Sequence, residues 1–260
     1  MIDSRAIIEE GAKIGKNVTV GPNAFISKDA IIGDNCTIMQ GAVIDGKTTI
    51  GEGTRIFYNS VIGSIPQDLK YQGEDVELII GKNNTIREFC LINPGTKGGG
   101  GKTIIGDNNL LMGYVHVAHD CKIGNNCILA NAATLAGHVE LEDFVVIGGM
   151  TPIHQFVKIG SYAMIAGASA VGQDIPPYCL AEGNRARLRG LNLTGLRRKF
   201  DKETINELKR AYKELFLSSK PLMEAAKELL KSENEHVRKL ALFVLETKRG
   251  IPLPRKEADA

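Results

Sequence analysis

Four of the five histidines in this chain lie between positions 116 and 154, and one of them precedes an aspartate. That pair is His119-Asp120, and the other three histidines are His116, His138 and His154. An imidazole titrates near neutral pH, so it can act as a general base that removes a proton from a hydroxyl or an amine. A neighbouring carboxylate can hold the imidazole in one tautomer. These residue types therefore suit proton abstraction, provided that the fold brings them together.

The elements that would position these residues follow from a six-residue repeat. An aliphatic residue stands at every sixth position from Ile8 to Ile62, at three more positions within 80–92, and, after a shift of one residue, from Ile105 to Val171. One inward aliphatic residue per short strand is typical of a parallel β-helix. About 25 hexads, three to a triangular coil, predict about eight coils and a prism roughly 40 Å long. The pattern resembles that of left-handed β-helices, so the expected fold is mainly β, with a C-terminal α-helical tail.

The remaining positions of the hexad agree with narrow coils. Glycine often follows the aliphatic residue, and asparagine often stands two residues further on. Both residue types tolerate the backbone conformations of tight corners. The asparagines expected at corners are Asn17, Asn23, Asn35, Asn59, Asn83, Asn108 and Asn126.

Most of the cysteines occupy the small inward position of the hexad, where they would serve as small hydrophobic residues. They are Cys36, Cys90, Cys121 and Cys127, whereas Cys179 lies outside the repeat. Because the number is odd and no C-x-x-C motif occurs, we expect neither structural disulfides nor thiol catalysis.

The coil length predicts which polar residues become neighbours, because residues 18 apart lie over one another in a triangular coil. His119 is then stacked with Gly137, and Asp120 is stacked with His138. None of these residues stands at the inward aliphatic position, so they point outward or occupy corners. One patch is expected, made of His119, Asp120, Gly137, His138, His154 and Gln155.

Three interpretations of this patch remain open. It could be a polar ladder along a corner, without chemistry. It could bind zinc, since imidazoles are common zinc ligands and a related hexapeptide family, the gamma-class carbonic anhydrases, binds zinc between subunits. It could also perform general-base catalysis, with His119 as the base and Asp120 as the acid that orients it.

Two interruptions of the repeat, at 64–79 and 93–104, are expected to form loops on one face of the prism, often the binding face of a solenoid. The second, NPGTKGGGGKTI, is interpreted as a flexible loop. Its string Gly101-Lys102-Thr103 is not a phosphate-binding P-loop, because the upstream glycine is Gly95 where the motif requires one at Thr96. Nucleotide hydrolysis is therefore rejected.

The solenoid is assigned to residues 1–180, and a basic linker with three helices to 181–260. Asp201 is expected to cap the first helix, Pro221 to begin the second, and Ser232 with Glu235 to form a capping box for the third. The tail is expected to pack on the solenoid or on a neighbouring subunit. The linker is either a solvated segment or a docking patch for an acidic partner or anionic ligand. Its cations are Arg185, Arg187, Arg189, Arg197, Arg198 and Lys199.

Composition excludes several other classes of protein. The chain has 43% apolar residues and a net charge of +2, which is not the composition of a disordered protein. Nine prolines cannot supply a collagen period. No apolar run approaches the ~20 residues of a membrane span, and the N-terminal sequence does not resemble a signal peptide. The expected location is the cytoplasm.

Three strings carry a specific resemblance: AHDC at 118–121, ATLAGH at 133–138 and HQF at 154–156. With the segments 67–71, 181–184 and 192–198 they resemble the UDP-N-acetylglucosamine acyltransferases of lipid A biosynthesis. The resemblance covers essentially the whole chain. It implies a homotrimer of left-handed β-helices with active sites between subunits and no cofactor or nucleic-acid partner. It also implies transfer of a 3-hydroxyacyl group from acyl carrier protein to the 3-position of UDP-N-acetylglucosamine.

The same resemblance implies roles for individual residues. His119 would be the general base, Asp120 would support it, and the N–H of Gly137 would donate to the oxyanion of acyl transfer. Gly167 matches the position that measures acyl-chain length, and glycine there leaves room for a long chain. Substrate-binding or activity roles fall to Gln67, Asp68, Lys70, His116, His138, His154, Gln155, Asn192 and Arg198.

Two departures from the family pattern concern the acceptor. Thr194 stands where the best-known relatives carry an acid, and Arg185 replaces a histidine. Some family members acylate a 3-amino sugar and form an amide, so this acceptor stays open. The related N-acyltransferase of the same pathway usually has an extra N-terminal domain, whereas the repeat here begins at Ile8. A structural scaffold is the non-catalytic alternative, against which the histidine cluster argues.

Overall fold

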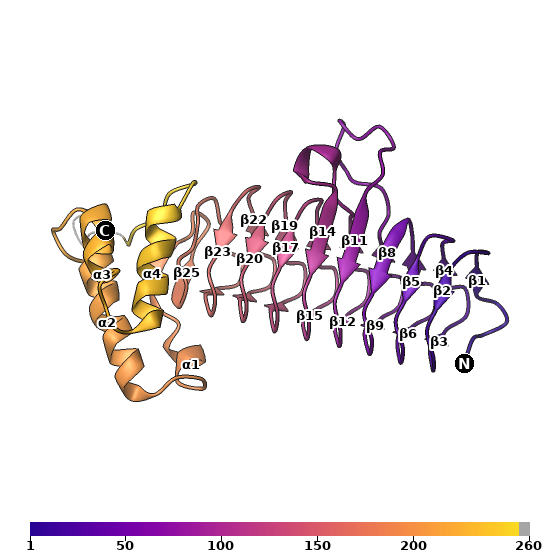
Figure 1. Cartoon of the computed structure of the whole chain (residues 1–260), viewed down its shortest axis with the longest axis horizontal. Coiled ribbons are helices and arrows are strands. Elements are labelled where there is room, and N and C mark those ends of the chain that lie inside the picture. The colour runs from indigo at the N-terminus through magenta and orange to yellow at the C-terminus, as the bar shows by residue number, and fades with distance from the viewer. Residues whose placement is uncertain (255–260) are drawn as a thin grey trace.

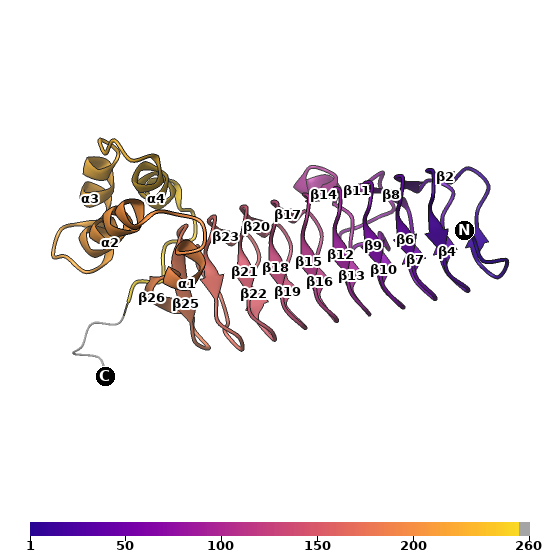
Figure 2. The ribbon, with the colours of Figure 1, turned by 90° about the horizontal axis from the view of Figure 1, so that it is seen from below.

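The chain winds into a triangular prism whose three sides are parallel sheets, and helices pack at one end (Figure 1). The computed structural model describes residues 1–254. Successive strands belong to different sides, so that strands three apart in the chain are hydrogen-bonded neighbours. Figure 2 shows the coils stacked along the long axis, with α2, α3 and α4 gathered beyond the last coil. The expected left-handed parallel β-helix of hexapeptide repeats with a C-terminal helical tail is confirmed.

The three sides are called sheets I, II and III. Sheet I contains β1 (Ile7–Ile8), β4 (Phe25–Ile26), β7 (Val43–Ile44), β10 (Val61–Ile62), β13 (Leu91–Ile92), β16 (His116–Val117), β19 (Thr134–Leu135) and β22 (Pro152–Ile153). Sheet II contains β2 (Lys13–Ile14), β5 (Ile31–Ile32), β8 (Lys47–Ile50), β11 (Glu77–Ile80), β14 (Lys102–Ile105), β17 (Lys122–Ile123), β20 (Glu140–Leu141) and β23 (Lys158–Ile159). Sheet III contains β3 (Thr19–Val20), β6 (Thr37–Ile38), β9 (Arg55–Ile56), β12 (Thr85–Ile86), β15 (Leu110–Leu111), β18 (Ile128–Leu129), β21 (Val146–Ile147), β24 (Met164–Ile165), β25 (Cys179–Glu182) and β26 (Arg187–Leu191).

The core of the prism is made by the aliphatic residue that recurs in each hexad. In sheet I the register pairs Ile26 with Ile44 and Ile44 with Ile62, and all three side chains are fully buried. Each side chain therefore packs on its equivalents in the coils on either side. Burying one such side chain contributes about 1.5–3 kcal/mol, so the repeated core holds the coils in one register.

The corners between sides use the left-handed backbone region. All seven asparagines expected at corners have φ between 54° and 59°. Asp120, His138 and Phe156 adopt the same conformation, with φ of 61°, 62° and 65°. The corner geometry of the hexad thus also fixes the backbone of the expected site.

The four cysteines of the repeat face the interior, as expected. Each thiol donates a hydrogen bond to a carbonyl oxygen of the following coil, for example Cys121 Sγ to Ala136 O at 3.2 Å. Burial raises the pKa of the thiols of Cys90, Cys121 and Cys127 to about 12, so these thiols stay protonated and unreactive at neutral pH. All five cysteines are free.

The two interruptions of the repeat project from the same side of the prism, between sheets I and II (Figure 1). Residues 63–76 connect β10 to β11, and residues 93–101 connect β13 to β14, with a short 3₁₀ helix at Lys97–Gly99. Each loop ends earlier than expected, because Glu77 and Lys102 already begin sheet II strands. We call these connections the first and the second loop.

The segment expected to be a basic linker is partly sheet. β25 continues sheet III in parallel, and β26 pairs with it antiparallel. The helices are α1 (Leu193–Leu196), α2 (Lys202–Phe216), α3 (Leu222–Leu229) and α4 (Glu235–Glu246). Asp201 caps α2 as expected, and Pro221 precedes α3. The expected cap of α4 is wrong: Asn234 caps it and accepts from the N–H groups of His236 and Val237.

The helical tail is joined to the last coils by polar contacts. His236, expected at the surface, lies with its Nδ1 3.1 Å from the hydroxyl of Tyr178. Lys239 of α4 pairs with Glu142 of the corner between sheets II and III at 3.1 Å. After α4, Thr247 donates to the buried carboxylate of Asp174 at 2.7 Å. Within residues 1–254, no helix is both long enough and apolar enough to cross a membrane.

Candidate active site

The expected patch lies at the corner between sheets I and II, where β16 leads into β17. Asp120, His138 and Phe156 occupy equivalent places in three successive coils, and the rings of His138 and Phe156 are stacked 4.4 Å apart. His119 and Gly137 stand one residue earlier in their coils. The helical repeat therefore brings together residues that lie 18 positions apart in the sequence, as the period predicted.

A short hydrogen bond joins the two residues of the sequence pair. His119 Nδ1 lies 2.7 Å from Asp120 Oδ2. The Asp120 side chain is 0% exposed and that of His119 is 17% exposed. Because the carboxylate can only accept, this contact assigns the proton to Nδ1 of the neutral imidazole. Nε2 is then the nitrogen that can take a proton from a substrate.

Gly137 lies directly against the base. A Cβ on this residue would come within 2.6 Å of His119 Cε1, closer than real Cβ atoms approach. Glycine is therefore required here by the ring of His119. Within residues 1–254 the Gly137 N–H has no hydrogen-bond acceptor. A free N–H beside a base is the arrangement that an oxyanion donor needs.

Two further histidines surround the pair. The ring of His138 meets that of His119 edge to face at 5.2 Å, and its Nε2 is 3.8 Å from Asp120 Oδ2. Burial lowers the pKa of His138, an effect that the charges of Asp120 and Asp68 partly oppose. His116 has Nδ1 3.1 Å from the Leu91 carbonyl, and burial lowers its pKa as well. Neutral imidazoles are favoured at both positions.

The zinc interpretation can be compared with this geometry. One ligating atom from each of His119, Asp120 and His138 lies within 4.8 Å of the others, a spacing that an ion could use. However, ligands at 2.0–2.3 Å around a tetrahedral zinc ion are about 3.3 Å apart. The 2.7 Å between His119 Nδ1 and Asp120 Oδ2 is shorter, and it is the length of a hydrogen bond. This contact favours proton transfer over metal binding.

The predicted substrate residues fall into separate groups. Asp68 and Lys70 of the first loop line a cavity of about 630 Å³ that also includes Thr96 of the second loop. Gln67 precedes them and is exposed. His154, which is exposed, lines another cavity of about 650 Å³ with Arg185.

Other predicted residues lie away from the His119 corner. Gly167 is exposed at a different corner, between sheets III and I. The buried side chain of Asn192 caps α1 and donates to the Tyr162 carbonyl at 2.9 Å, so it has a structural role within the chain. Arg198 is exposed next to α1. Gln155 is exposed at the same corner as His119, two coils further along the prism.

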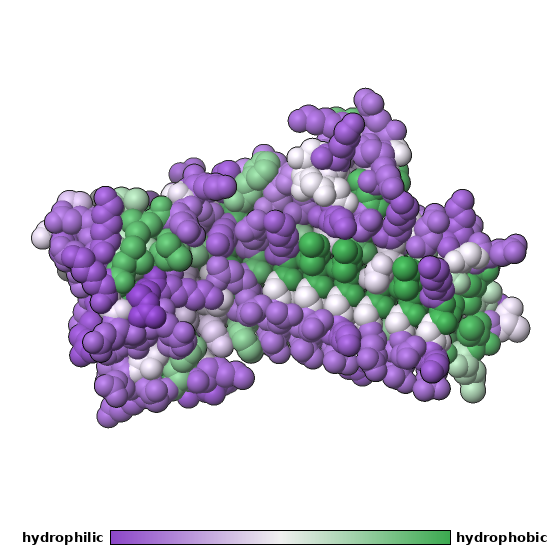
Figure 3. Space-filling view, in the orientation of Figure 1, coloured by the Kyte–Doolittle hydropathy of each residue, from purple (hydrophilic) through white to green (hydrophobic). Residues whose placement is uncertain are grey.

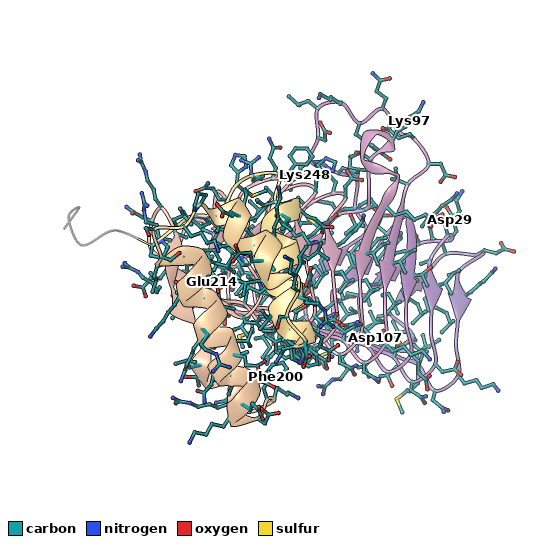
Figure 4. All side chains as sticks on the ribbon, turned by 60° about the vertical axis from the view of Figure 1, so that its left-hand side comes forward. Asp29, Lys97, Asp107, Phe200, Glu214 and Lys248 are labelled. Atoms are coloured by element: carbon teal, nitrogen blue, oxygen red, sulfur yellow. The ribbon has the colours of Figure 1, made fainter. Side chains whose placement is uncertain are left out.

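Several residues that lie outside the repeat, but next to His119 and Asp120, were not predicted from the sequence. Thr96 of the second loop donates to both oxygens of Asp120. A cavity of about 600 Å³ extends from Asp120 and His138 to Lys248 and Arg249, which follow α4. Figure 4 shows Lys97 of the second loop and Lys248 on the same edge of the molecule. The glycine-rich sequence of the second loop was the one signal that could have pointed to these contacts. However, no repeat spacing relates this loop to Asp120.

Comparisons with known proteins show the family to which this chain is similar. A family model described as bacterial transferase hexapeptide (six repeats) matches 29–64 and 102–137, and one described as UDP N-acetylglucosamine O-acyltransferase, domain 2, matches 174–252. A relative from Aliarcobacter butzleri, named acyl-[acyl-carrier-protein]–UDP-N-acetylglucosamine O-acyltransferase, is 68% identical over 98% of this chain and 99% of its own. The structure of UDP-N-acetylglucosamine acyltransferase from Campylobacter jejuni has 57% identity and a TM-score of 0.95, covering 98% of this chain and 100% of its own.

The fold and these matches define the class as a hexapeptide-repeat acyltransferase. A further relative of the same name, from Sulfurovum sp., is 62% identical over 98% of both chains. The chain belongs to the acyl-[acyl-carrier-protein]–UDP-N-acetylglucosamine O-acyltransferase family.

Proposed function

We propose that this protein transfers a 3-hydroxyacyl group from acyl carrier protein to the 3-hydroxyl of UDP-N-acetylglucosamine, the first step of lipid A biosynthesis. The observation that carries the proposal is the corner where His119, hydrogen-bonded to buried Asp120, packs on the free N–H of Gly137. A base, a group that orients it and a donor for a developing negative charge are the parts that acyl transfer requires.

The proposed reaction uses each of these groups once. His119 Nε2 removes the proton of the sugar 3-hydroxyl while the oxygen attacks the thioester carbonyl carbon. The carbonyl oxygen becomes an oxyanion, which accepts a hydrogen bond from Gly137 N–H. When the C–S bond breaks, the imidazolium returns its proton to the thiolate of the carrier. Asp120 stabilises the imidazolium throughout, because its carboxylate is the partner of Nδ1–H.

The substrate residues are assigned by the same proposal. The first-loop residues Asp68 and Lys70 bind substrate near His138, and His154 contributes from the neighbouring coil. The exposed guanidinium of Arg198 suits the diphosphate of the nucleotide sugar. Gly167 leaves room for the end of a long acyl chain. The remaining members of the assigned set are Gln67, His116, Gln155 and Asn192.

We further propose that the protein is a homotrimer whose active sites lie between subunits, in the cytoplasm. Gly167 is at one corner of the prism and His119 is at another. A site that uses both residues must therefore take His119 from one chain and Gly167 from another. Large hydrophobic side chains at the corner of Gly167 are exposed, namely Phe89 by 48%, Tyr114 by 62% and Met150 by 73%. Figure 3 shows a further hydrophobic band, which follows the strands of sheet II on another side of the prism. Such surface is typical of an interface.

The acceptor is tested by mass spectrometry of the products. Purified protein is given acyl carrier proteins of several chain lengths with UDP-N-acetylglucosamine or its 3-amino analogue. We expect an O-acylated product that still forms in the presence of a chelator. A preference for the 3-amino sugar would assign amide formation instead, in accord with Thr194 and Arg185. Loss of product on chelation with recovery on adding zinc would contradict the proposed base.

A further inference from the structure

The carboxylate of Asp120 is completely removed from water, so its hydrogen bonds must come from the protein. Thr96 supplies two of them: its N–H donates to Oδ1 at 2.8 Å, and its hydroxyl donates to Oδ2 at 2.7 Å. The third is from His119 Nδ1 to Oδ2. The backbone N–H of Asp120 donates to the hydroxyl of buried Thr103, at 2.8 Å. The second loop, through Thr96, and the strand that follows it, β14, through Thr103, therefore both hold this one residue.

The second loop is folded tightly enough to keep Thr96 in place. The Thr96 carbonyl accepts from the N–H groups of Gly99 and Gly101, at 3.0 and 2.8 Å. Gly100 and Gly101 have φ of 96° and 79°, a region that L side chains rarely adopt. A Cβ on Gly99 would lie 2.0 Å from Asp120 Cγ. The loop backbone thus rests against the carboxyl group, and the expected flexible loop is instead a packed cover.

We propose that Thr96 is a positioning residue for the His119–Asp120 pair, and that Gly99 allows the second loop to approach the carboxylate closely enough for this role. The loop then selects the Nδ1–H tautomer of His119, because both Asp120 oxygens are held in one orientation. The effect on rate rests on the proposed function, whereas the effect on the tautomer can be measured in the free protein.

The hydroxyl of Thr96 also limits how strongly Asp120 stabilises a charged imidazole. Oδ2 accepts from both Thr96 and His119, so its negative charge is shared between two donors. Without the hydroxyl, more of this charge acts on the imidazolium, and the acidic limb of the pH profile of kcat/KM moves to higher pH. Other titratable groups near the pair are His116, His138 and Asp68. The cavity beside Asp120 is also lined by the charged residues Lys122, Glu140, Lys158, Asp174, Glu246, Lys248 and Arg249. None of them is changed by the substitutions below.

The first test compares Thr96→Val with Thr96→Ser. Valine keeps the shape and the backbone N–H but removes the hydroxyl, whereas serine restores the hydroxyl. We expect Thr96→Val to lower kcat about 10-fold, the lower end of the cost of removing an outer partner of a functional group, with little change in KM. The acidic limb should move to higher pH, and Thr96→Ser should return both quantities toward the wild type.

The second test uses two adjacent glycines of the 3₁₀ helix. Gly99→Ala places its Cβ against the Asp120 carboxyl, whereas a Cβ on Gly98 meets no atom within 4 Å. We expect Gly99→Ala to lower kcat at least as much as Thr96→Val and Gly98→Ala to leave it unchanged. In ¹⁵N-histidine spectra of the free protein, Gly99→Ala should reduce the fraction of Nδ1–H tautomer of His119, because it displaces the Asp120 carboxyl that accepts from Nδ1.

The outcomes separate the two proposals. If the wild type transfers the acyl group and His119→Ala does not, but Thr96→Val keeps the wild-type rate and pH profile, the positioning role is wrong. Equal losses in Thr96→Val and Thr96→Ser with an unmoved acidic limb also contradict it. If Thr96→Val fails to fold, the Gly99→Ala and Gly98→Ala pair decides the question. A wild-type protein without transfer activity would overturn the proposed function, while the tautomer measurement would still test the loop.

Discussion

At the residue scale, the candidate chemistry depends on the orientation and protonation of one imidazole. His119 is fixed by Asp120 at Nδ1 and by the close contact with Gly137. Neither contact is visible in the sequence pair alone, since adjacent residues need not be hydrogen-bonded. Here the left-handed φ of Asp120 turns its carboxylate back toward the preceding ring.

Replacing His119 with alanine tests the base directly. We expect His119→Ala to lower kcat by about 10³-fold, within the range of a lost general base, because the nitrogen that takes the proton is removed. Product formation measured over time checks this. The variant should keep the size and thermal unfolding of the wild type, since His119 is not in the aliphatic core. Turnover near the wild-type rate would rule out the assigned base.

Two half-buried histidines give the fold a pH dependence. Burial lowers the pKa of His116 and His138 below the ordinary value of 6.5, so the unfolded chain binds protons at these sites before the folded chain does. Stability should therefore fall as the pH decreases below about 6.5. Denaturant unfolding at pH 5 and pH 7 measures the loss. Replacing His116 with glutamine should make the two values closer, and an unchanged difference would contradict its contribution.

At the element scale, the hexad forms the strands and corners, and the two loops inserted in the repeat add side chains and backbone groups that the corners do not contain. The second loop gives Asp120 its donors, and the first loop brings Asp68 and Lys70 toward the same edge. The helical tail closes the last coil and places the segment 247–250 beside the site. This segment is held by Asp174, which accepts from Thr247, Lys248 and Arg249.

Replacing Asp174 with alanine should loosen this segment. The substitution leaves the Lys158 N–H and the three donors of 247–249 without their acceptor. We expect the free energy of unfolding to fall by about 2–3 kcal/mol, since the lost hydrogen bonds involve a buried charge. Urea unfolding measures this loss, and faster hydrogen exchange in 247–250 should accompany it. Glu233→Ala, at an exposed position before α4, is the control and should change neither quantity.

At the scale of the whole molecule, the prism separates functions onto different corners. The His119 corner holds the proposed chemistry, while the corner of Gly167 carries exposed aromatic side chains. Phe89 and Tyr114 stack there with ring centres 5.2 Å apart. A single prism leaves this apolar surface in water, whereas three chains around one axis could bury it.

The trimer is tested by placing a charge in that surface. Tyr114→Asp should shift the protein from trimer to monomer in light scattering, because an unpaired charge would be buried at the interface. Acyl transfer should be lost together with the trimer. Lys82→Asp, on the corner between sheets II and III, provides the matched control and should remain trimeric. A wild-type monomer with full activity would disprove active sites between subunits.

The sequence by itself determined the repeating part of this protein. A period of six specifies inward residues, corner residues and the neighbours at 18 positions, so the sheets, the corner asparagines and the contact of His119 with Gly137 were all predictable. These features depend on local geometry that every coil repeats. The cap of α2 at Asp201 and the start of α3 after Pro221 likewise depend on local sequence. At α4, Asn234 replaced the expected cap because its side chain reaches two N–H groups.

The tertiary structure decided what the repeat does not encode. The position of a loop relative to a corner depends on packing between segments without a common period, as in the hydrogen bonds of Thr96 and Thr103 to Asp120, 24 and 17 residues away. The same holds for Asp174 and the segment after α4, more than 70 residues apart. Sequence periodicity therefore located the base, and only the folded chain determined which residues hold it in position.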